Sequence, residues 1–344
     1  MADAVVFEDV NIVFGDKPES ALPLMDAGKD RTEVQQETGQ VLGVHNCSLT
    51  VGEGELLVLM GLSGSGKSTL LRAVNRLNPV CRGRVLVNDG TQMTDVTSAD
   101  NKTLRHIRLS RVSMVFQQFG LLPWRNVRDN VALGLEFAGL SKKERLDKAE
   151  TQLELVGLKD WGDKLVSELS GGMQQRVGLA RAFATEAPIL LMDEPFSALD
   201  PLIRTRLQDE LIELQRNLKR TIIFVSHDLD EAFKIGDRIA IMEGGRIVQC
   251  GTPSEIVRQP ADAYVADFVA NVNPLGVLRA ADVMSDDQAP DGAHPININT
   301  KLADMMDALG KGATLSVVDG DGRTVGSVRP SNVVTALNPA IPLG

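Results

Sequence analysis

The sequence is poor in cysteine and has no excess of basic residues, and each shortage excludes a class of protein. Its 344 residues contain three cysteines, Cys47, Cys81 and Cys250, which lie far apart and without the paired spacing of a disulfide framework or a metal site. We therefore expect a reducing compartment. The formal net charge of -10 repels a nucleic-acid backbone, so we predict that nucleic acid is not a partner.

Apolar runs long enough to cross a membrane are missing as well. The first residues, MADAVVFEDV, carry acids where a secretory signal needs a basic segment followed by an apolar one. No later run approaches the roughly 18 apolar residues that span a bilayer. If the protein works at a membrane, we expect other chains to hold it there.

Short apolar runs alternate with helical segments through the middle of the chain. Runs that are buried on both faces are typical of parallel strands in an α/β sheet. They are ELLVLM at 55–60, RVSMVF at 111–116, PILLMDE at 188–194 and TIIFVS at 221–226. Three other segments show an alternating pattern, which predicts a small antiparallel β region beside the parallel sheet. They are VVFEDVNIVF, VHNCSLTV and RVLVND.

Helical periodicity without any strand pattern predicts an inserted helical subdomain at about 120–186. Residues 16–40 are polar and predict an extension outside the core, in which Asp30 caps a short helix that Gly39 ends. Turn-forming residues near 270–276 predict a boundary between one domain at 1–275 and a C-terminal unit at 276–344.

A glycine-rich loop follows the apolar run at 55–60 and opens a helix, which is the context of a phosphate-binding loop. Its glycines let the backbone approach a ligand, and its N–H groups face the phosphates. In such loops Lys67 reaches the β and γ oxygens, and the Ser68 hydroxyl ligates Mg²⁺. The predicted nucleotide-binding residues are Gly61, Leu62, Ser63, Gly64, Ser65, Gly66, Lys67, Ser68 and Thr69. A turn that merely starts a helix is the alternative, and the flanking strand and helix argue against it.

Two carboxylates end the apolar run at 188–194. Asp193 is expected to hold Mg²⁺ indirectly, and Glu194 is the predicted general base, which accepts or orients the proton of an attacking water. Carboxylates at the end of a buried strand are costly unless a cation lies near them. An acidic strand end in a solvated turn is the alternative, but the position downstream of the phosphate loop favours the catalytic interpretation. With the parallel sheet, these residues predict the α/β core of a P-loop NTPase (RecA-like).

The segment LSGGMQQR at 169–176 indicates a second anion site. It offers a hydroxyl and backbone N–H groups at the start of a helix that we expect to begin near Met173. Two such sites on separate subdomains of one chain cannot easily enclose one nucleotide. We therefore predict a head-to-tail homodimer in which each protomer covers the γ-phosphate of the other. A plain helix cap is the alternative. The residues predicted to act in trans are Ser170, Gly171, Gly172 and Met173.

These motifs, in this order, resemble those of ATP-binding-cassette (ABC) transporter ATPases over about residues 1–275. The others that match are VFQQFGLLPW, DEPFSALD and SHDLDEA. The resemblance implies that Gln117 senses Mg²⁺ and the attacking water, that Asp200 acts across the dimer and that His227 contacts the γ-phosphate. A solvated Gln and a His that caps a helix are the alternatives. The implied metal residues are Ser68, Gln117 and Asp193.

Two positions depart from the family pattern. The family usually stacks adenine on an aromatic residue at the end of the first strand, where Phe14 is the only candidate. The 16–40 insertion separates Phe14 unusually far from Gly61, and a plain core residue is the alternative. Met173 stands where many relatives carry Gln. We expect it to be tolerated, because Ser170 and the backbone bind the anion.

Longer segments are similar to ATPase subunits of glycine betaine, proline and choline uptake systems. The segments are MGLSGSGKSTLLRAVNRL, DEPFSALDPLIRTRLQDELIELQ and HDLDEAFKIGDRIAIMEGGRIVQCGTP. The resemblance implies an ATPase that uses ATP and Mg²⁺ to energise import of quaternary ammonium osmolytes. It also implies integral-membrane permease subunits, a separate solute-binding protein and a peripheral location at the cytoplasmic face of the bacterial inner membrane.

The solute itself is expected to bind elsewhere. A quaternary ammonium cation needs an aromatic cage. The two Trp, one Tyr and ten Phe of this chain form no cluster in the sequence. Import of another small polar solute, such as an amino acid, is the alternative within the family.

The last part of the chain predicts a helix, a strand, a DGDG hairpin turn, a strand and a helix. This stretch is similar to a single cystathionine-β-synthase-type (CBS) regulatory repeat. Relatives with such a tail usually carry two repeats. Two protomers that pair their single repeats, and a structural tail without a ligand, are the alternatives.

Two other classes of function fit the sequence less well. A cassette ATPase that acts on DNA or ribosomes usually has long coiled coils or basic linkers. Here about 100 residues join the phosphate loop to the LSGGM motif, and the net charge is negative. A regulator that only binds nucleotide would not need Lys67, Asp193, Glu194 and His227 together. For a transporter, the residues expected to pass motion to a permease lie beside Gln117 and are Leu121, Leu122, Pro123 and Trp124.

Overall fold

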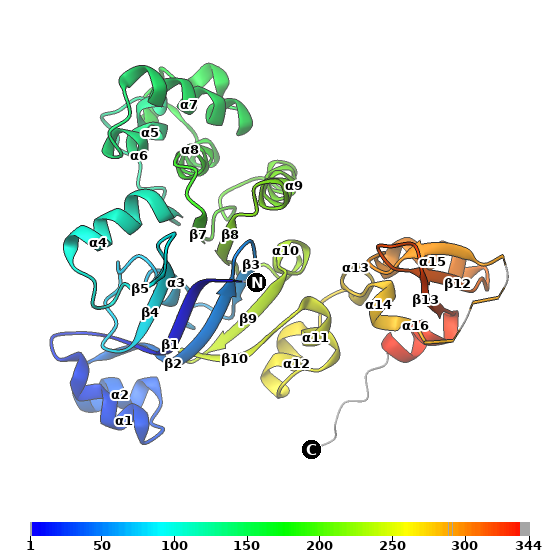
Figure 1. The fold of residues 1–344 in the computed structure, drawn as a ribbon. Helices are drawn as coiled ribbons and strands as arrows, with labels where there is room; N and C mark the ends of the chain where they lie inside the picture. The colour runs from blue at the N-terminus through cyan, green and yellow to red at the C-terminus, as the bar shows by residue number, and fades with distance from the viewer. Residues whose placement is uncertain (1, 288, 291, 338–344) are drawn as a thin grey trace. The chain divides into compact units, whose positions relative to one another are not determined.

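The structure is a computed structural model that describes residues 2–287, 289–290 and 292–337. The chain divides into two compact units (Figure 1). The first unit comprises Met1–Asp228 and Ala240–Val248, and the second comprises Leu229–Ile239 and Gln249–Gly344. The predicted boundary near residue 275 stays a prediction.

A four-stranded antiparallel sheet forms from the alternating segments near the N-terminus, as predicted. Its strand order is β2-β1-β4-β5, and β1 pairs with both β2 and β4. The strands are β1 (Asp3–Phe14), β2 (Val41–Gly52), β4 (Arg82–Asn88) and β5 (Met93–Asp95). The pairing brings Phe14 opposite Val41, so the insertion of residues 16–40 is a loop whose two ends lie side by side.

A six-stranded sheet carries the site. Its strand order is β10-β9-β3-β8-β7-β6, and the four central apolar runs form parallel neighbours, as predicted. The strands are β3 (Leu56–Met60), β6 (Val112–Val115), β7 (Ile189–Asp193), β8 (Thr221–Val225), β9 (Arg238–Glu243) and β10 (Arg246–Gly251). Every residue of β3, β7 and β8 is buried, which explains why these strands are apolar except at Asp193, the last residue of β7, and Thr221, the first residue of β8.

The parallel arrangement gathers four loops at one edge, because the carboxyl ends of parallel strands lie together. β3 runs into the phosphate loop, β6 leads to Gln117, β7 ends at Asp193 and β8 leads to His227. Residues that are more than 150 positions apart in the sequence thereby meet.

Helices make up the rest of the first unit. Between β3 and β6 lie α3 (Lys67–Leu71) and α4 (Asn101–His106), the latter continued by a π-helical turn at Ile107–Arg111. The segment predicted as helical contains no strand and forms a group of helices (Figure 1). These are α5 (Val127–Val131), α6 (Leu133–Phe137), α7 (Lys142–Leu155), 3-10 turns at Lys159–Trp161 and Val166–Glu168, and α8 (Gly171–Ala184). The long helix α9 (Pro201–Leu218) follows β7.

The extension between β1 and β2 has more structure than its polar sequence suggests. It contains a 3-10 turn at Pro18–Ala21, then α1 (Leu22–Asp26) and α2 (Arg31–Thr38). As predicted, Asp30 caps α2 by accepting a hydrogen bond from the backbone of Glu33, and Gly39 ends the helix in a left-handed conformation. Five buried side chains hold it against the antiparallel sheet, namely Val13, Ala21, Met25, Val34 and Leu42. The extension is therefore a packed element with its own small core.

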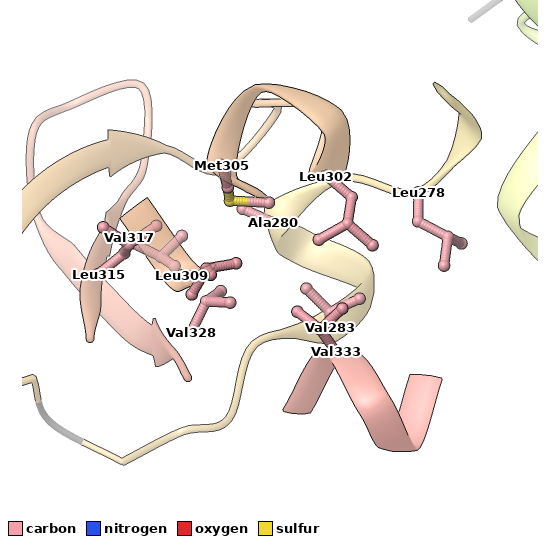
Figure 2. Close-up of a cluster of buried hydrophobic side chains, with 10 residues drawn as sticks. All are labelled: Leu278, Ala280, Val283, Leu302, Met305, Leu309, Leu315, Val317, Val328 and Val333. Carbon is pink, nitrogen blue, oxygen red and sulfur yellow. The ribbon is translucent and has the colours of Figure 1, made fainter. Parts of the chain in front are cut away.

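The second unit has a three-stranded sheet of β11 (His294–Asn297), β12 (Leu315–Val318) and β13 (Thr324–Val328), in that order. The predicted succession of helix, strand, turn, strand and helix is found in α15 (Leu302–Gly310), β12, β13 and α16 (Pro330–Leu337), whereas β11, parallel to β12, was not anticipated. Ten buried side chains form its core, namely Leu278, which follows α13 (Pro274–Val277), and nine from α14 (Ala280–Val283), α15, β12, β13 and α16 (Figure 2). The identity of this unit as a CBS repeat stays a prediction.

The elements of the second unit begin with α10 (Leu229–Ile235), α11 (Pro253–Arg258), α12 (Ala263–Val269), α13 (Pro274–Val277) and α14 (Ala280–Val283). They continue with β11 (His294–Asn297), α15 (Leu302–Gly310), β12 (Leu315–Val318), β13 (Thr324–Val328) and α16 (Pro330–Leu337). Among the described residues of the chain, no helix has both the length and the apolar character that a membrane span requires.

Candidate nucleotide-binding and catalytic site

A cavity of about 510 Å³ lies where the carboxyl ends of the central strands meet the phosphate loop. Most residues predicted to bind or hydrolyse a nucleotide line it. These are Phe14, Ser63, Gly64, Gly66, Lys67, Ser68, Thr69, Gln117, Glu194 and His227. Arg31, Val41, Leu42 and Gly43 also line it, and the sequence had not indicated any of these four.

The glycines of the phosphate loop are required by its backbone. Gly61 has φ +138°, and a Cβ atom there would lie 2.1 Å from the carbonyl oxygen of Met242. Gly66 has φ +103°, and a Cβ atom there would lie 2.6 Å from the carbonyl oxygen of Gly43. Gly66 is also the N-cap of α3 and gives no side-chain cap, so the first N–H groups of this helix remain for a ligand to bind.

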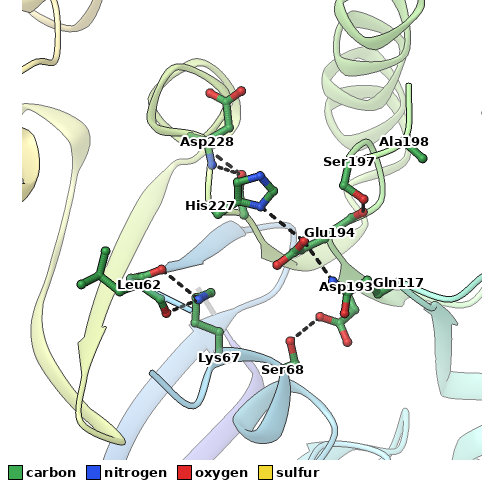
Figure 3. A network of polar contacts seen from close by, with 12 residues as sticks. Leu62, Lys67, Ser68, Gln117, Asp193, Glu194, Ser197, Ala198, His227 and Asp228 are labelled. Carbon is green, nitrogen blue, oxygen red and sulfur yellow. Dashed lines mark hydrogen bonds and ion pairs between the residues drawn. The ribbon is translucent and has the colours of Figure 1, made fainter. Parts of the chain in front are cut away.

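Lys67 is folded back onto its own loop. Its Nζ donates to the carbonyl oxygens of Gly61, at 2.8 Å, and Leu62, at 2.9 Å (Figure 3). Burial lowers the pKa of the Lys67 ammonium, and the nearby carboxylates of Glu194 and Asp193 oppose that effect. A phosphate that binds here would replace neutral carbonyl partners with an anion, which favours its capture by this cation.

Asp193 is fully buried and satisfied on both oxygens. Ser68 Oγ donates to Oδ1 at 2.6 Å, and the Arg72 guanidinium donates to Oδ2 from Nη2 at 2.7 Å and from Nε at 3.1 Å. Arg72 is the cation that a buried carboxylate needs. It was missed from the sequence, although it lies four residues after Ser68 and helical spacing places both on one face.

Glu194 has an uncommon backbone conformation, with φ +49° in the left-handed region. Its Oε2 accepts a hydrogen bond from Gln117 Nε2 at 3.2 Å and lies 3.3 Å from His227 Nδ1 (Figure 3). Its carbonyl oxygen accepts from Gln175 Nε2 at 3.2 Å and from Ser197 Oγ at 3.1 Å. The three predicted catalytic side chains are thus in contact, and Gln175, which lies inside LSGGMQQR, joins the helix of that motif to the catalytic strand.

Phe14 is 38% exposed and lines the cavity. A Cβ atom on Gly43 would lie 2.9 Å from the Phe14 ring and 3.0 Å from the Thr69 methyl, so the ring and the start of α3 close in on the same point. This position favours a role in the cavity over the alternative of a core residue. Stacking on adenine stays a prediction.

The LSGGM motif opens α8, but the helix starts earlier than predicted. It begins at Gly171 and not near Met173, because Ser170 adopts an extended conformation and accepts a hydrogen bond from the Met173 backbone at 3.4 Å. Asp200 caps α9 in the same way, at 3.0 Å from the Ile203 backbone. Within one chain both residues are helix caps. Their roles across a dimer, like those of Gly171 and Gly172, stay predictions.

The loop after Gln117 is tied to α8 by an arginine that the sequence had not indicated. Arg181 donates to the carbonyl oxygens of Gly120 and Phe119, each at 2.7 Å, and burial lowers its pKa. The next residues are held by Asn130, whose Oδ1 accepts from the Leu122 backbone at 2.7 Å. Trp124 nevertheless remains 73% exposed, as a large side chain that contacts another protein would be.

The parallel sheet, the phosphate loop and the carboxylate pair define a P-loop ATPase, and the LSGGM helix gives it the form of an ATP-binding cassette. The family described as ABC transporter matches residues 44–197. The chain is 49% identical over 283 residues to the glycine betaine/proline betaine transport system ATP-binding protein ProV of Escherichia coli. The matched region covers 82% of this chain and 70% of that protein.

A second relative covers nearly all of both chains. The trimethylamine N-oxide transport system ATP-binding protein TmoW of Pelagibacter ubique is 41% identical over 337 residues, 97% of each protein. In structure, the chain is similar to a dimeric ATP-binding cassette in a post-hydrolysis state bound to ADP and phosphate. The TM-score is 0.62 at 29% identity, over 72% of this chain and 98% of that chain. The chain belongs to the family of ABC transporter ATP-binding proteins, as its motifs predicted.

Proposed function

We propose that the chain is the ATP-hydrolysing subunit of an ABC importer of quaternary ammonium osmolytes such as glycine betaine or choline. The observation that carries the ATPase assignment is the meeting of Gln117, Glu194 and His227 at the cavity that Lys67 and Ser68 line. The solute class is supported by the relatives, which act in glycine betaine and trimethylamine N-oxide transport. An importer of another small polar solute, such as an amino acid, is the alternative.

Glu194 is the proposed general base. A carboxylate that lines the cavity accepts or orients the proton of the water that attacks the γ-phosphate. Gln117 and His227 both approach the same oxygen of Glu194, which restricts its orientation before any nucleotide binds. Lys67 balances the charge on the transferred phosphate.

The residues present fit a magnesium ion. Mg²⁺ prefers oxygen ligands, and the site offers the Ser68 hydroxyl and the Gln117 amide oxygen, with Asp193 behind Ser68. Ser68 can ligate through its lone pair and still donate its proton to Asp193. Bound with ATP, the ion would neutralise charge on the β and γ phosphates.

We further propose that two chains assemble head to tail. Ser170 and Gly171 are exposed at the start of α8 and do not line the cavity of their own chain. A second chain supplies them to the γ-phosphate. ATP binding would close the dimer, and hydrolysis would reopen it.

The partners follow from this arrangement. The exposed Trp124, with Leu121, Leu122 and Pro123, would meet an integral-membrane permease, and a separate solute-binding protein would deliver the osmolyte. We propose that the chain is a peripheral subunit at the cytoplasmic face of the bacterial inner membrane. The net charge of -10 leaves nucleic acid an unsuitable partner.

The ATPase proposal is tested by Glu194→Gln, with Glu154→Gln as the matched control. Among the described residues, the Glu154 side chain pairs only with Lys159 and is exposed, so its replacement should leave hydrolysis unchanged. Glu194→Gln should lower the hydrolysis rate by at least about 100-fold and accumulate an ATP-bound dimer. The rate is measured by phosphate release and the dimer by size-exclusion chromatography. Hydrolysis at the normal rate in Glu194→Gln would remove Glu194 from the role of base.

The solute is tested by reconstituting the chain with its permease and binding protein in vesicles. Radiolabelled glycine betaine, choline and a neutral amino acid are supplied in turn, with ATP on the side of this chain. Uptake of glycine betaine or choline that Glu194→Gln abolishes supports the osmolyte proposal. Uptake of the amino acid alone favours the alternative.

A further inference from the structure

The extension at residues 16–40 contributes a side chain to the nucleotide cavity. Arg31 is the first residue of α2, and it lines the cavity together with Lys67, Ser68 and Gly64. None of the catalytic or phosphate-binding roles described above requires this arginine or the helix that carries it. A basic residue in a polar insertion, 33 positions before Gly64, nevertheless reaches the phosphate loop.

The guanidinium joins two walls of the cavity. Nη1 donates to the carbonyl oxygen of Gly64 in the phosphate loop, and Nη2 donates to that of Gly43, near the start of β2, at 3.1 Å. The same oxygen of Gly43 is the atom that a side chain at Gly66 would strike. Arg31 therefore bridges the loop and the strand beside it, close to the point where Gly66 approaches the Gly43 carbonyl.

The helix that carries Arg31 is held in place by its N-terminal cap and by the small core of the extension. Asp30 and Glu33 form a capping box at the start of α2, which sets the position of Arg31 at the first helical residue. The buried Val34 and Met25 anchor the extension to the antiparallel sheet. A long flexible side chain is thereby presented on a rigid support, which lowers the entropy lost when it orders.

Burying the Arg31 guanidinium costs free energy, because its charge loses contact with water. Its hydrogen bonds to Gly64 and Gly43 go to neutral carbonyl oxygens, which carry no opposing charge. Burial lowers the pKa of the guanidinium, so the surrounding protein disfavours its charge. Its Nε is buried and has no hydrogen-bond partner among the described residues. A bound polyphosphate is the anion that this cavity is built to hold, and it would compensate a cation on the cavity wall.

We propose that Arg31 is a positioning residue of the nucleotide site, which holds the phosphate loop against β2 and adds a fixed positive charge to the bound nucleotide. The inference rests on the proposed nucleotide binding and assigns a part in it to the extension. Among the described contacts, Arg31 bonds neither to Glu194 nor to Asp193. It therefore contributes to nucleotide affinity and not to the chemical step.

The test compares Arg31→Gln with Lys29→Gln in the full chain. Both changes remove one positive charge from the extension, but Lys29 is paired with Glu37 and does not line the cavity. Binding is measured with a fluorescent ATP analogue in the presence of Mg²⁺, and kcat and KM are measured by phosphate release. Arg31→Gln should raise both Kd and KM about tenfold while kcat stays within about twofold.

Arg31→Lys and Lys67→Ala complete the set. Arg31→Lys keeps the charge but cannot bridge two carbonyls in the fixed fork of a guanidinium, so it should recover only part of the lost affinity. Lys67→Ala should abolish binding of the analogue. If Lys67→Ala binds it normally, the proposed nucleotide site is wrong, whatever Arg31 does.

Three results would overturn the inference while leaving the nucleotide site intact. One is equal affinity loss in Arg31→Gln and Lys29→Gln, which would indicate general charge only. Another is a fall in kcat as large as the rise in KM, which would place Arg31 in the chemical step or in folding. The third is no change in Kd for Arg31→Gln when Lys67→Ala has lost binding.

Discussion

Two glycine-rich segments open helices in this chain, namely the phosphate loop and LSGGM. They differ in how their polar side chains are bonded within the chain. In the phosphate loop before α3, the polar side chains bond within their own chain, Lys67 to loop carbonyls and Ser68 to Asp193. The LSGGM segment at the start of α8 is exposed at Ser170 and Gly171, and the Ser170 hydroxyl caps that helix. The helix start at Gly66 has no side-chain cap, whereas at the other Ser170 caps the helix through its oxygen and keeps its hydroxyl proton to donate to an anion.

The difference also appears in the glycines. Gly66 has a left-handed backbone and no room for a side chain, whereas Gly171 would meet nothing within 4 Å. The fold therefore requires a glycine at position 66 but not at position 171. Because the single chain does not require a glycine at position 171, a close approach by another molecule would explain why a residue without a side chain is present there. A second copy of the chain is the candidate.

The strongest test of this comparison asks whether the two segments act in trans. In a mixed dimer of Ser170→Arg and Lys67→Ala protomers, trans geometry leaves one composite site intact. The reciprocal dimer pairs the double variant with wild type and leaves none. We expect about one trapped ATP per dimer in the first and close to none in the second, measured in a Glu194→Gln background by nucleotide content after gel filtration.

This design separates the two geometries directly. If each chain completed its own site, the single-variant dimer would trap no ATP and the double-variant dimer would trap one. That reversed pattern would exclude the head-to-tail arrangement. Counting trapped nucleotide, and not turnover, keeps the result independent of whether hydrolysis needs two working sites.

The next test compares the two glycines. Gly66→Ala should destabilise the first unit by about 2 kcal/mol, because its Cβ would lie 2.6 Å from the Gly43 carbonyl oxygen at φ +103°. Gly171→Ala should change stability by less than about 0.5 kcal/mol, since the position is open and alanine favours helix. Urea denaturation measures both. Hydrolysis should nevertheless fall in Gly171→Ala, and unchanged hydrolysis would show that no second chain packs there.

The same contrast explains how far the sequence could predict the molecule. The phosphate loop, the carboxylate pair and LSGGM are each contained in a few consecutive residues, so their presence and order were readable. The apolar runs that became β3, β6, β7 and β8 were equally local signals. The element β11 was missed because its four residues include a proline and gain their strand form only by pairing with β12.

The residues that support the site were harder to predict from the sequence. Arg72 could have been found from its helical spacing to Ser68. Arg31 could not, because its contact with Gly64 depends on how the extension packs on β1 and β2, and no local pattern in residues 16–40 reports that packing. Motifs thus predicted most of the residues that line the cavity, while the residues that support them, apart from Arg72, could be identified only from the fold.

The smallest expected effect concerns the cap itself. Ser170→Ala removes a cap with a long hydrogen bond of 3.4 Å and should cost about 0.5–1 kcal/mol of stability. Ser141 caps α7 in the same group of helices, with its oxygen 3.3 Å from the Glu144 backbone, and Ser141→Ala should cost a similar amount. Urea denaturation gives the stability of each variant, and phosphate release gives its activity.

The two serine variants differ in what they should do to hydrolysis. Only Ser170 belongs to LSGGM, so only Ser170→Ala should lower the rate, because the hydroxyl is then missing from the phosphate of the other protomer. An equal loss of hydrolysis in Ser141→Ala would mean that stability of the helical group accounts for the effect. In that case Ser170 would be a helix cap in the dimer as well as in the single chain, and the comparison between the two helix starts would lose its functional meaning.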